Sequence, residues 1–149
     1  MAKKIRVLLV DDEKEFLESL SERFELRGFE VYKAQSGSEA IRVVEKNKIH
    51  AAVVDLKMPD MDGLVTITKL KEIQPKIKTI LLTGFGSQKV KQASEALESD
   101  YFEKGQMGSF WDFIKKLPQR LEDTMAAAGM ASGGDIDDAK KIDKESKED

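Results

Sequence analysis

The chain has 149 residues, 40% of them hydrophobic, and a formal net charge of −3. It contains no cysteine, which excludes disulfides and thiolate metal sites. No stretch is apolar and long enough for a signal peptide or a membrane span, so we expect a cytoplasmic protein without a membrane partner.

The charges separate two regions of the chain. Residues 125–149 hold seven acidic residues and four lysines, whereas residues 1–124 carry 21 charges of each sign. This balance is unlike a basic nucleic-acid-binding domain, so we expect no nucleic acid partner. We expect one domain over residues 1–124 and a charged tail over 125–149, flexible or partly helical. A docking role for the tail stays open.

Short apolar segments alternate with amphipathic ones along the first region. Strands are expected to begin near residues 5, 30, 51, 78 and 101, and each precedes a helical pattern. Arg27-Gly28 ends the first helix, and Ser36-Gly37-Ser38-Glu39 reads as a capping box for the second. Pro118 should kink the fifth helix or start a new segment. The alternation predicts a doubly wound α/β fold with a five-strand parallel sheet and five helices.

Polar residues follow the strands at one edge of this sheet. They are Asp11 and Asp12, Asp55, Thr83 and Lys104. In doubly wound sheets the site lies at the carboxyl ends of the strands, so these side chains should converge. Three carboxylates repel each other unless a cation joins them, and hard oxygen ligands select Mg²⁺, with Mn²⁺ as an alternative. A phosphoryl group would complete the site, because a carboxylate can attack phosphorus while a lysine and a hydroxyl bind its oxygens.

These motifs resemble the receiver domain of two-component response regulators, in the stand-alone chemotaxis-receiver type. The resemblance runs from about Lys3 to Leu121. It rests on four stretches: Val10-Asp11-Asp12-Glu13, Asp55-Leu56-Lys57-Met58-Pro59-Asp60-Met61-Asp62-Gly63, Leu82-Thr83-Gly84 and Tyr101-Phe102-Glu103-Lys104. It implies a flavodoxin-like sheet with strand order 2-1-3-4-5.

The resemblance also assigns roles to single residues. Asp55 would be the phosphoacceptor. The Mg²⁺ ligands would be Asp55, Asp12, Asp11 directly or through water, and the main-chain carbonyl of Lys57.

Three further residues would respond to the phosphoryl group. Thr83 would hydrogen-bond it, Lys104 would pair with its oxygens, and Tyr101 would turn inward as a switch.

The phosphoryl group would come from a phospho-histidine on a sensor kinase or a phosphotransfer protein. An unidentified output protein would then read the face made by the fourth helix, last strand and fifth helix. That face could also support a weak homodimer of an otherwise monomeric chain. Such a protein is no enzyme beyond its own phosphorylation and dephosphorylation.

One departure from the family pattern and two variable positions concern the surroundings of this site. Gly105 follows the lysine where the family usually has proline, so we expect a trans peptide bond or a looser loop. Lys57 and Phe85 occupy the variable positions that tune dephosphorylation in the family. We predict slow-to-moderate self-hydrolysis, which loss of the phosphoryl group within seconds would contradict.

Other interpretations of the same residues remain. Asp11 and Asp12 could be acidic residues at a helix N-terminus, Thr83 a turn hydroxyl, Lys104 a solvated charge and Tyr101 a packed aromatic. A haloacid-dehalogenase-like phosphohydrolase also uses Mg²⁺ and an aspartate nucleophile, but would need Asp-x-Asp after the first strand. A phosphate-independent scaffold would normally have lost one of the site residues.

Overall fold

Five parallel strands form one sheet in the computed structural model, which describes residues 4–121. Their order, β2-β1-β3-β4-β5, is the one predicted. The strands are β1 (Arg6–Val10), β2 (Glu30–Ala34), β3 (Ala51–Val54), β4 (Lys78–Thr83) and β5 (Asp100–Glu103). Each begins within one residue of its predicted position. The predicted fold class is therefore confirmed.

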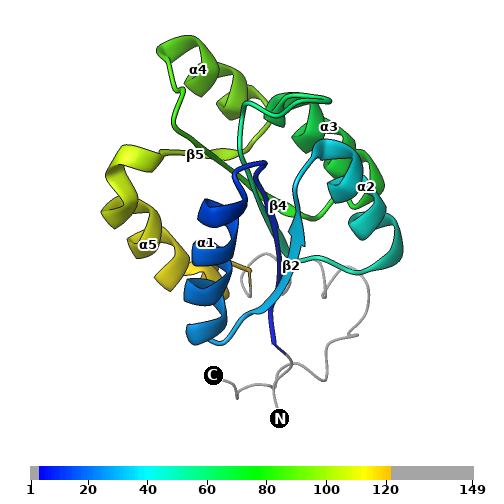
Figure 1. Ribbon diagram of the computed structural model, residues 1–149, viewed down its shortest axis with the longest axis vertical. Helices are drawn as coiled ribbons and strands as arrows, with labels where there is room; N and C mark the ends of the chain where they lie inside the picture. Colours follow the sequence, from blue (N-terminus) through cyan, green and yellow to red (C-terminus); the bar gives the residue numbers. More distant parts are fainter. Residues whose placement is uncertain (1–3, 122–149) are drawn as a thin grey trace. The chain divides into compact units, whose positions relative to one another are not determined.

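A helix follows each strand, and together they give the chain its alternating course (Figure 1). They are α1 (Lys14–Leu26), α2 (Gly37–Lys46), α3 (Gly63–Ile73), α4 (Gln88–Ala96) and α5 (Met107–Lys115), with a 3₁₀ turn η1 (Lys104–Gln106) before α5. The helical backbone is interrupted at Lys116 and resumes from Leu117 to Leu121. Pro118 lies in the first turn of this new segment, where a missing N–H is tolerated, as predicted.

The chain contains two compact units. Residues Ile5–Phe110 contain the whole sheet and helices α1 to α4. The other described residues are Lys4 and Trp111–Leu121. Within this second unit the Arg120 guanidinium lies 4.7 Å from the centre of the Phe113 ring.

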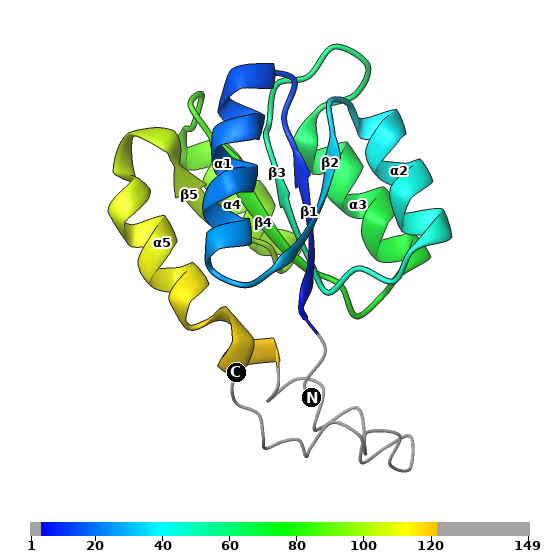
Figure 2. The ribbon, with the colours of Figure 1, turned by 60° about the horizontal axis from the view of Figure 1, so that its bottom comes forward.

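The central strands β1, β3 and β4 are buried on both faces, which explains their uninterrupted apolar sequences. Helices α2 and α3 cover one face, and α1 covers the other (Figure 2). On the α1 face, Phe24 makes edge-to-face contacts with Phe29 and Phe110. Strand β2 buries only Ala34 fully, in agreement with its predicted place at the sheet edge.

The ends of the helices follow the sequence signals with one difference. Gly28, just beyond α1, has a φ of 91°, a conformation that favours glycine. Ser36 Oγ accepts a hydrogen bond from Glu39 N, as a capping box requires. The Glu39 carboxylate, however, accepts its bond from Gln35 N, one residue earlier than the motif predicts. The carboxylate still satisfies a backbone donor next to the cap.

Helix α4 packs more loosely than its neighbours. Ser94 is its only buried residue, whereas α3 buries Gly63, Thr66, Ile67 and Leu70. Of the apolar residues of α4, Val90 is partly buried against the core. No helix between residues 4 and 121 is long and apolar enough to cross a membrane. The charged tail predicted over 125–149 lies outside the described residues.

Candidate functional site

Strands β1 and β3 are neighbours in the sheet, and their ends place the carboxylates of Asp11 and Asp55 side by side. Val10 and Val54 are register partners in the parallel pair β1·β3, and each strand ends directly before an aspartate. Asp55 N donates to the Val10 carbonyl at 2.9 Å, which holds Asp55 against β1. Asp11 and Asp55 are only 3% and 4% exposed. Both carboxyl groups are thus buried at the mouth of the sheet, as the sequence predicts.

Asp12 joins these two residues in an acidic cluster. One carboxylate oxygen from each of Asp11, Asp12 and Asp55 lies within 4.8 Å of the other two. Asp12 is exposed, so the cluster is open to solvent on its side. Asp55 Oδ1 is buried and has no hydrogen-bond donor among the described residues. A buried oxygen of this kind, in an all-carboxylate set, fits a hard divalent cation such as Mg²⁺.

The electrostatics of the cluster oppose ionisation of its members. Burial, and then the charge of Asp11, raises the pKa of Asp55 to about 6, although Lys104 acts in the opposite direction. Burial also raises the pKa of Asp11, against the hydrogen bonds from Lys104 and from Glu13 N. The cluster therefore needs added positive charge at neutral pH.

Lys104 supplies part of that charge within the protein. Its Nζ lies 2.9 Å from Asp11 Oδ2, 3.1 Å from Glu13 Oε1 and 3.7 Å from Asp55 Oδ1. The ammonium group also sits 4.3 Å from the centre of the Phe16 ring. Burial disfavours the charged form of Lys104, but the neighbouring carboxylates outweigh burial and raise its pKa.

The departure at Gly105 leaves this arrangement intact. The described residues contain no cis peptide bond, so the bond before Gly105 is trans, as expected. Lys104 begins the 3₁₀ turn η1, and no atom would lie within 4 Å of a Cβ added at Gly105. The loop is open here, yet the Lys104 ammonium reaches the acidic cluster.

Thr83 ends β4 and is fully buried. Its Oγ1 accepts a hydrogen bond from Phe85 N at 3.0 Å, which leaves the hydroxyl proton available to another acceptor. Val54 and Leu81 are register partners in the pair β3·β4, so Thr83 and Asp55 leave the sheet at the same edge.

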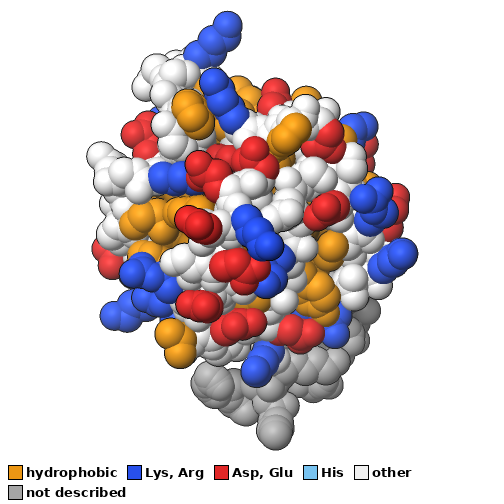
Figure 3. Space-filling view, viewed as in Figure 1, with side chains coloured by type: hydrophobic (Ala, Val, Ile, Leu, Met, Phe, Trp, Pro, Cys, Tyr) orange, Lys and Arg blue, Asp and Glu red, His pale blue; other side chains and the backbone are white. Residues whose placement is uncertain are grey.

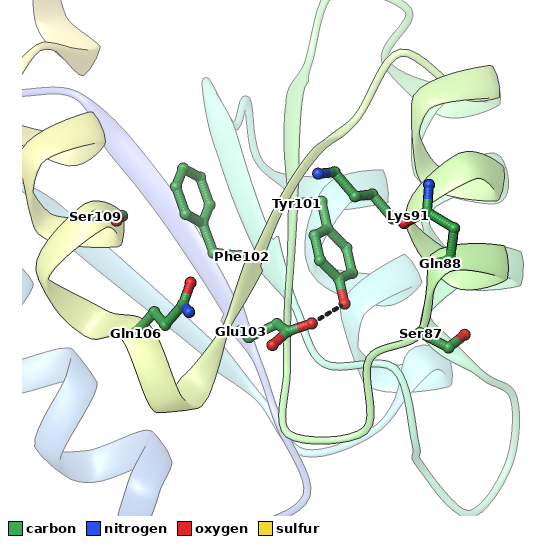
Figure 4. A pocket seen from close by; sticks show the side chains of 8 residues that line it. All are labelled: Ser87, Gln88, Lys91, Tyr101, Phe102, Glu103, Gln106 and Ser109. Atoms are coloured by element: carbon green, nitrogen blue, oxygen red, sulfur yellow. Dashed lines mark hydrogen bonds between the residues drawn. The ribbon is translucent and has the colours of Figure 1, made fainter.

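Tyr101 is held by hydrogen bonding on the side of β5 next to α4 (Figure 4). Its hydroxyl donates to Glu103 Oε2 at 2.7 Å. Burial, and then the Glu103 carboxylate, raises the pKa of Tyr101 to about 12. A Cβ added at Gly86 would lie 1.8 Å from the Tyr101 hydroxyl oxygen, so only glycine leaves room for this rotamer.

A groove of about 450 Å³ lies beside Tyr101. Its lining comes from α4, β5, η1 and the first turns of α5 (Figure 4): Ser87, Gln88, Lys91, Tyr101, Phe102, Glu103, Gln106 and Ser109. Of the predicted site residues, Tyr101 lines this groove.

Lys57 and Phe85 meet across the loops that follow β3 and β4. The Lys57 ammonium lies 4.4 Å from the centre of the Phe85 ring, and Phe85 is 58% exposed. The two variable positions thus form one cation–π contact at the surface. The role of the Lys57 carbonyl as a metal ligand stays a prediction.

Sequence reasoning left three contacting residues without a role. Glu13 and Phe16 hold Lys104, and Glu103 holds Tyr101. Glu13 could have been suspected, because it continues the acidic run that follows β1. Phe16 carries only a helical core signal, and Glu103 looks like any exposed strand residue. On the face shown in Figure 3, acidic and basic side chains mix over α1, so charge pattern alone does not single Glu13 out.

Comparison with known proteins shows which family the chain belongs to. The model of the response regulator receiver domain matches residues 7–108. The chain belongs to this family. The receiver domains of two-component systems are signalling domains. The acidic cluster and Lys104 all lie within the matched residues.

Two curated relatives indicate the range of proteins that contain such a domain. This chain is 30% identical over 92 residues to sporulation initiation phosphotransferase F of Bacillus subtilis, covering 62% of this receiver and 74% of that protein. It is 36% identical over 85 residues to the transcriptional regulatory protein GlrR of Escherichia coli. That match covers 57% of this chain but only 19% of GlrR, so the receiver spans a small part of that regulator.

Two solved structures show the same fold. A CheY-like receiver domain protein from Methanospirillum hungatei superposes with a TM-score of 0.75 at 27% identity, covering 84% of this receiver and 99% of that chain. The response regulator TrrA from Thermotoga maritima, solved in complex with Mg²⁺–BeF, gives a TM-score of 0.67 at 27% identity. The latter match covers 76% of this receiver and 98% of TrrA.

Proposed function

We propose that this receiver takes a phosphoryl group onto Asp55 with the help of Mg²⁺. The observation that carries the proposal is the buried Asp55 Oδ1, which has no hydrogen-bond donor among the described residues and stands within an acidic cluster. A carboxylate so placed is available as a nucleophile. The Mg²⁺–BeF complex of the relative TrrA supports a divalent cation in receivers of this fold.

The transfer needs one bond to form and one to break. An Asp55 carboxylate oxygen attacks the phosphorus of a phospho-histidine, the O–P bond forms, and the N–P bond breaks with its electron pair returning to the imidazole. Asp11, Asp12, Asp55 and the carbonyl of Lys57 would hold Mg²⁺. The metal ion would neutralise charge on the oxygens of the transferring phosphoryl group.

The surrounding side chains would then bind the product. Lys104, 3.7 Å from Asp55 Oδ1, is near enough to pair with a phosphoryl oxygen after a small shift away from Asp11. The free hydroxyl proton of Thr83 can be donated to another oxygen, because Thr83 Oγ1 only accepts from Phe85 N. A shift of Thr83 would move the loop before α4. This loop also packs against Tyr101 through Gly86.

The proposed output follows from that coupling. Inward movement of Tyr101 would break its hydrogen bond to Glu103 and change the groove beside it. The α4–β5–α5 face would then bind an unidentified output protein, or a second copy weakly, as a shift between two existing populations. The phosphodonor would be a cytoplasmic sensor histidine kinase or a phosphotransfer protein. We extend the receiver over residues 1–124, with 125–149 as a tail.

Intact-mass measurement tests the proposal. The protein is incubated with Mg²⁺ and acetyl phosphate or phosphoramidate, which donate a phosphoryl group without a kinase. We expect one added phosphoryl group in the wild-type chain and none in Asp55→Asn or without Mg²⁺. No adduct and no consumption of the donor would instead support a phosphate-independent scaffold. Rapid, continuing consumption of many phosphate esters would support a phosphohydrolase.

A further inference from the structure

The loop between β3 and α3 lies against the first turn of α2, and Asp60 makes the contact. Asp60 Oδ2 accepts hydrogen bonds from Ser38 N at 3.0 Å and from Ser38 Oγ at 2.5 Å. Asp60 Oδ1 accepts from Gly37 N at 3.2 Å and from Met61 N at 2.9 Å. One exposed carboxylate therefore joins two segments that are 22 residues apart in the sequence.

The same contact is closed by packing. A Cβ added at Gly37 would lie 2.3 Å from Met61 Cγ and 2.6 Å from Thr66 Oγ1. Gly37 itself is buried although it begins a helix. The first turn of α2 thus fits closely against the loop, and a side chain at position 37 would displace Met61.

Both ends of this loop are fixed by other bonds. Gly63 N donates to the Leu56 carbonyl at 2.7 Å, and Asp62 caps α3 through Val65 N. Met58 packs against the core cluster on the α2–α3 face. Asp60 is the side chain through which the segment between these points is hydrogen-bonded to a neighbouring helix.

We propose that Asp60 is a positioning residue for the Mg²⁺ site. By holding the loop on α2, it fixes the main chain at Lys57, whose carbonyl is the expected non-carboxylate ligand. This inference rests on the proposed function. Outer groups that orient a metal ligand commonly change metal affinity by 10–100-fold when removed, so a tether on a main-chain ligand has a measurable effect.

Asp60 is ionised when it makes these hydrogen bonds to α2. The hydrogen bonds from the Ser38 side chain and backbone lower the pKa of Asp60 to about 2, so the carboxylate stays ionised at neutral pH. It also faces the N-terminal end of α2, where a negative charge is favourable. Asp60 is therefore suited to binding backbone N–H groups.

The variants Asp60→Ala and Asp60→Asn test the proposal against a matched control, Ser36→Ala. Ser36 caps the same end of α2 through Glu39 N, so its loss weakens the helix without removing the bond to the loop. Mg²⁺ affinity is measured by titration calorimetry with MgCl₂. Amide hydrogen exchange at Lys57 and Met58 is followed in the metal-free proteins, and the rate of phosphorylation by acetyl phosphate is measured over a range of Mg²⁺ concentrations.

We expect Asp60→Ala to weaken Mg²⁺ binding about tenfold and to speed exchange at Lys57 and Met58. Asp60→Asn should be intermediate, because an amide keeps one acceptor oxygen. Phosphorylation of Asp60→Ala should recover the wild-type maximal rate at saturating Mg²⁺, which a general loss of stability would not produce. Ser36→Ala should lower the unfolding midpoint but bind Mg²⁺ like the wild type.

Two results would overturn the role of Asp60. One is unchanged Mg²⁺ affinity in Asp60→Ala. The other is an equal loss of affinity in Ser36→Ala, since the effect would then come from the stability of α2. A wild-type chain that binds no Mg²⁺ would overturn the proposed function together with this inference. That outcome differs from the two results above, in which the wild type still binds Mg²⁺.

Discussion

The two sides of Asp55 are built differently. On the α2–α3 side, which comprises the loop 56–62 and helices α2 and α3, hydrogen bonds and tight glycine contacts fix the main chain. On the α4–β5 side, which comprises the loop 84–87, helix α4, strand β5 and η1, residues Gly84 to Lys89 are all exposed. Helix α4 buries only Ser94. The first side suits a fixed site, and the second suits movement that transmits a signal.

The largest expected effect comes from placing the same substitution on the two sides. In Gly63→Ala the new Cβ would meet the Asp55 carbonyl oxygen at 2.2 Å and its carbon at 2.9 Å, both main-chain atoms. Because main chain cannot swing away, we expect a loss of about 3 kcal/mol in the free energy of unfolding. Gly105→Ala meets no atom within 4 Å and should change stability by less than about 0.5 kcal/mol. Urea denaturation of both variants measures the difference, and equal losses would remove the contrast.

Asp55→Asn should stabilise the metal-free protein. The pKa of Asp55 in the folded protein is about 6, against an ordinary value of 3.8, so the folded state binds this proton more tightly than the unfolded chain. Stability from this group is present at low pH and is lost as pH rises through about 4 to 6. We expect a gain of about 2 kcal/mol for Asp55→Asn at pH 7.5, shrinking towards zero near pH 4.

Chemical denaturation at several pH values, with EDTA, checks this prediction. Mg²⁺ should stabilise the wild type more than Asp55→Asn, because the carboxylate is an expected ligand. A stability gain that is independent of pH would mean that ionisation of Asp55 is not its origin.

Glu103→Gln tests whether Tyr101 is held on the α4–β5 side. Removing the carboxylate weakens the hydrogen bond and removes a negative charge beside the phenol. The pKa of Tyr101 should therefore fall from about 12 towards its ordinary value of 10. An absorbance titration of phenolate formation in a Tyr32→Phe background isolates this tyrosine. An unchanged titration would show that Glu103 does not hold the side chain in solution.

A small effect on stability is also expected where the two sides touch. Phe85→Ala removes the contact with the Lys57 ammonium from an exposed ring, so the loss should be below about 1 kcal/mol. Its effect should appear in the lifetime of the phosphorylated protein instead, because Lys57 and Phe85 occupy the positions expected to tune dephosphorylation. We expect a shorter half-life than in the wild type, measured by intact mass after removal of the donor. A longer half-life would show that the contact does not limit access of water.

The sequence predicts the sheet well because each strand has a simple local signal. Continuous apolar runs such as Val7 to Val10 arise only where helices cover both faces of the sheet. Parallel pairing then brings the strand ends to one edge, so the convergence of Asp11, Asp55 and Lys104 follows from topology. This explains why the carboxylate cluster could be predicted before any contact was known.

Contacts that depend on side-chain direction could not be predicted in the same way. Asp60 and Ser38 are far apart in the sequence, and their pairing requires the exact placement of α2 against the loop. The position of Tyr101 depends on the empty space at Gly86 and on the neighbouring Glu103. The capping box was shifted by one residue for a similar reason, since Gln35 N also lies within reach of Glu39.

Lys104 gives the metal-free receiver a tethered counterion. Its ammonium pairs with Asp11, which is also one of the carboxylates expected to bind a divalent cation. Uptake of Mg²⁺ would then be an ion exchange, in which the Lys104 ammonium leaves Asp11 while Glu13 keeps it nearby. Occupancy of the metal site and the position of Lys104, the proposed phosphate-binding lysine, would therefore be thermodynamically linked.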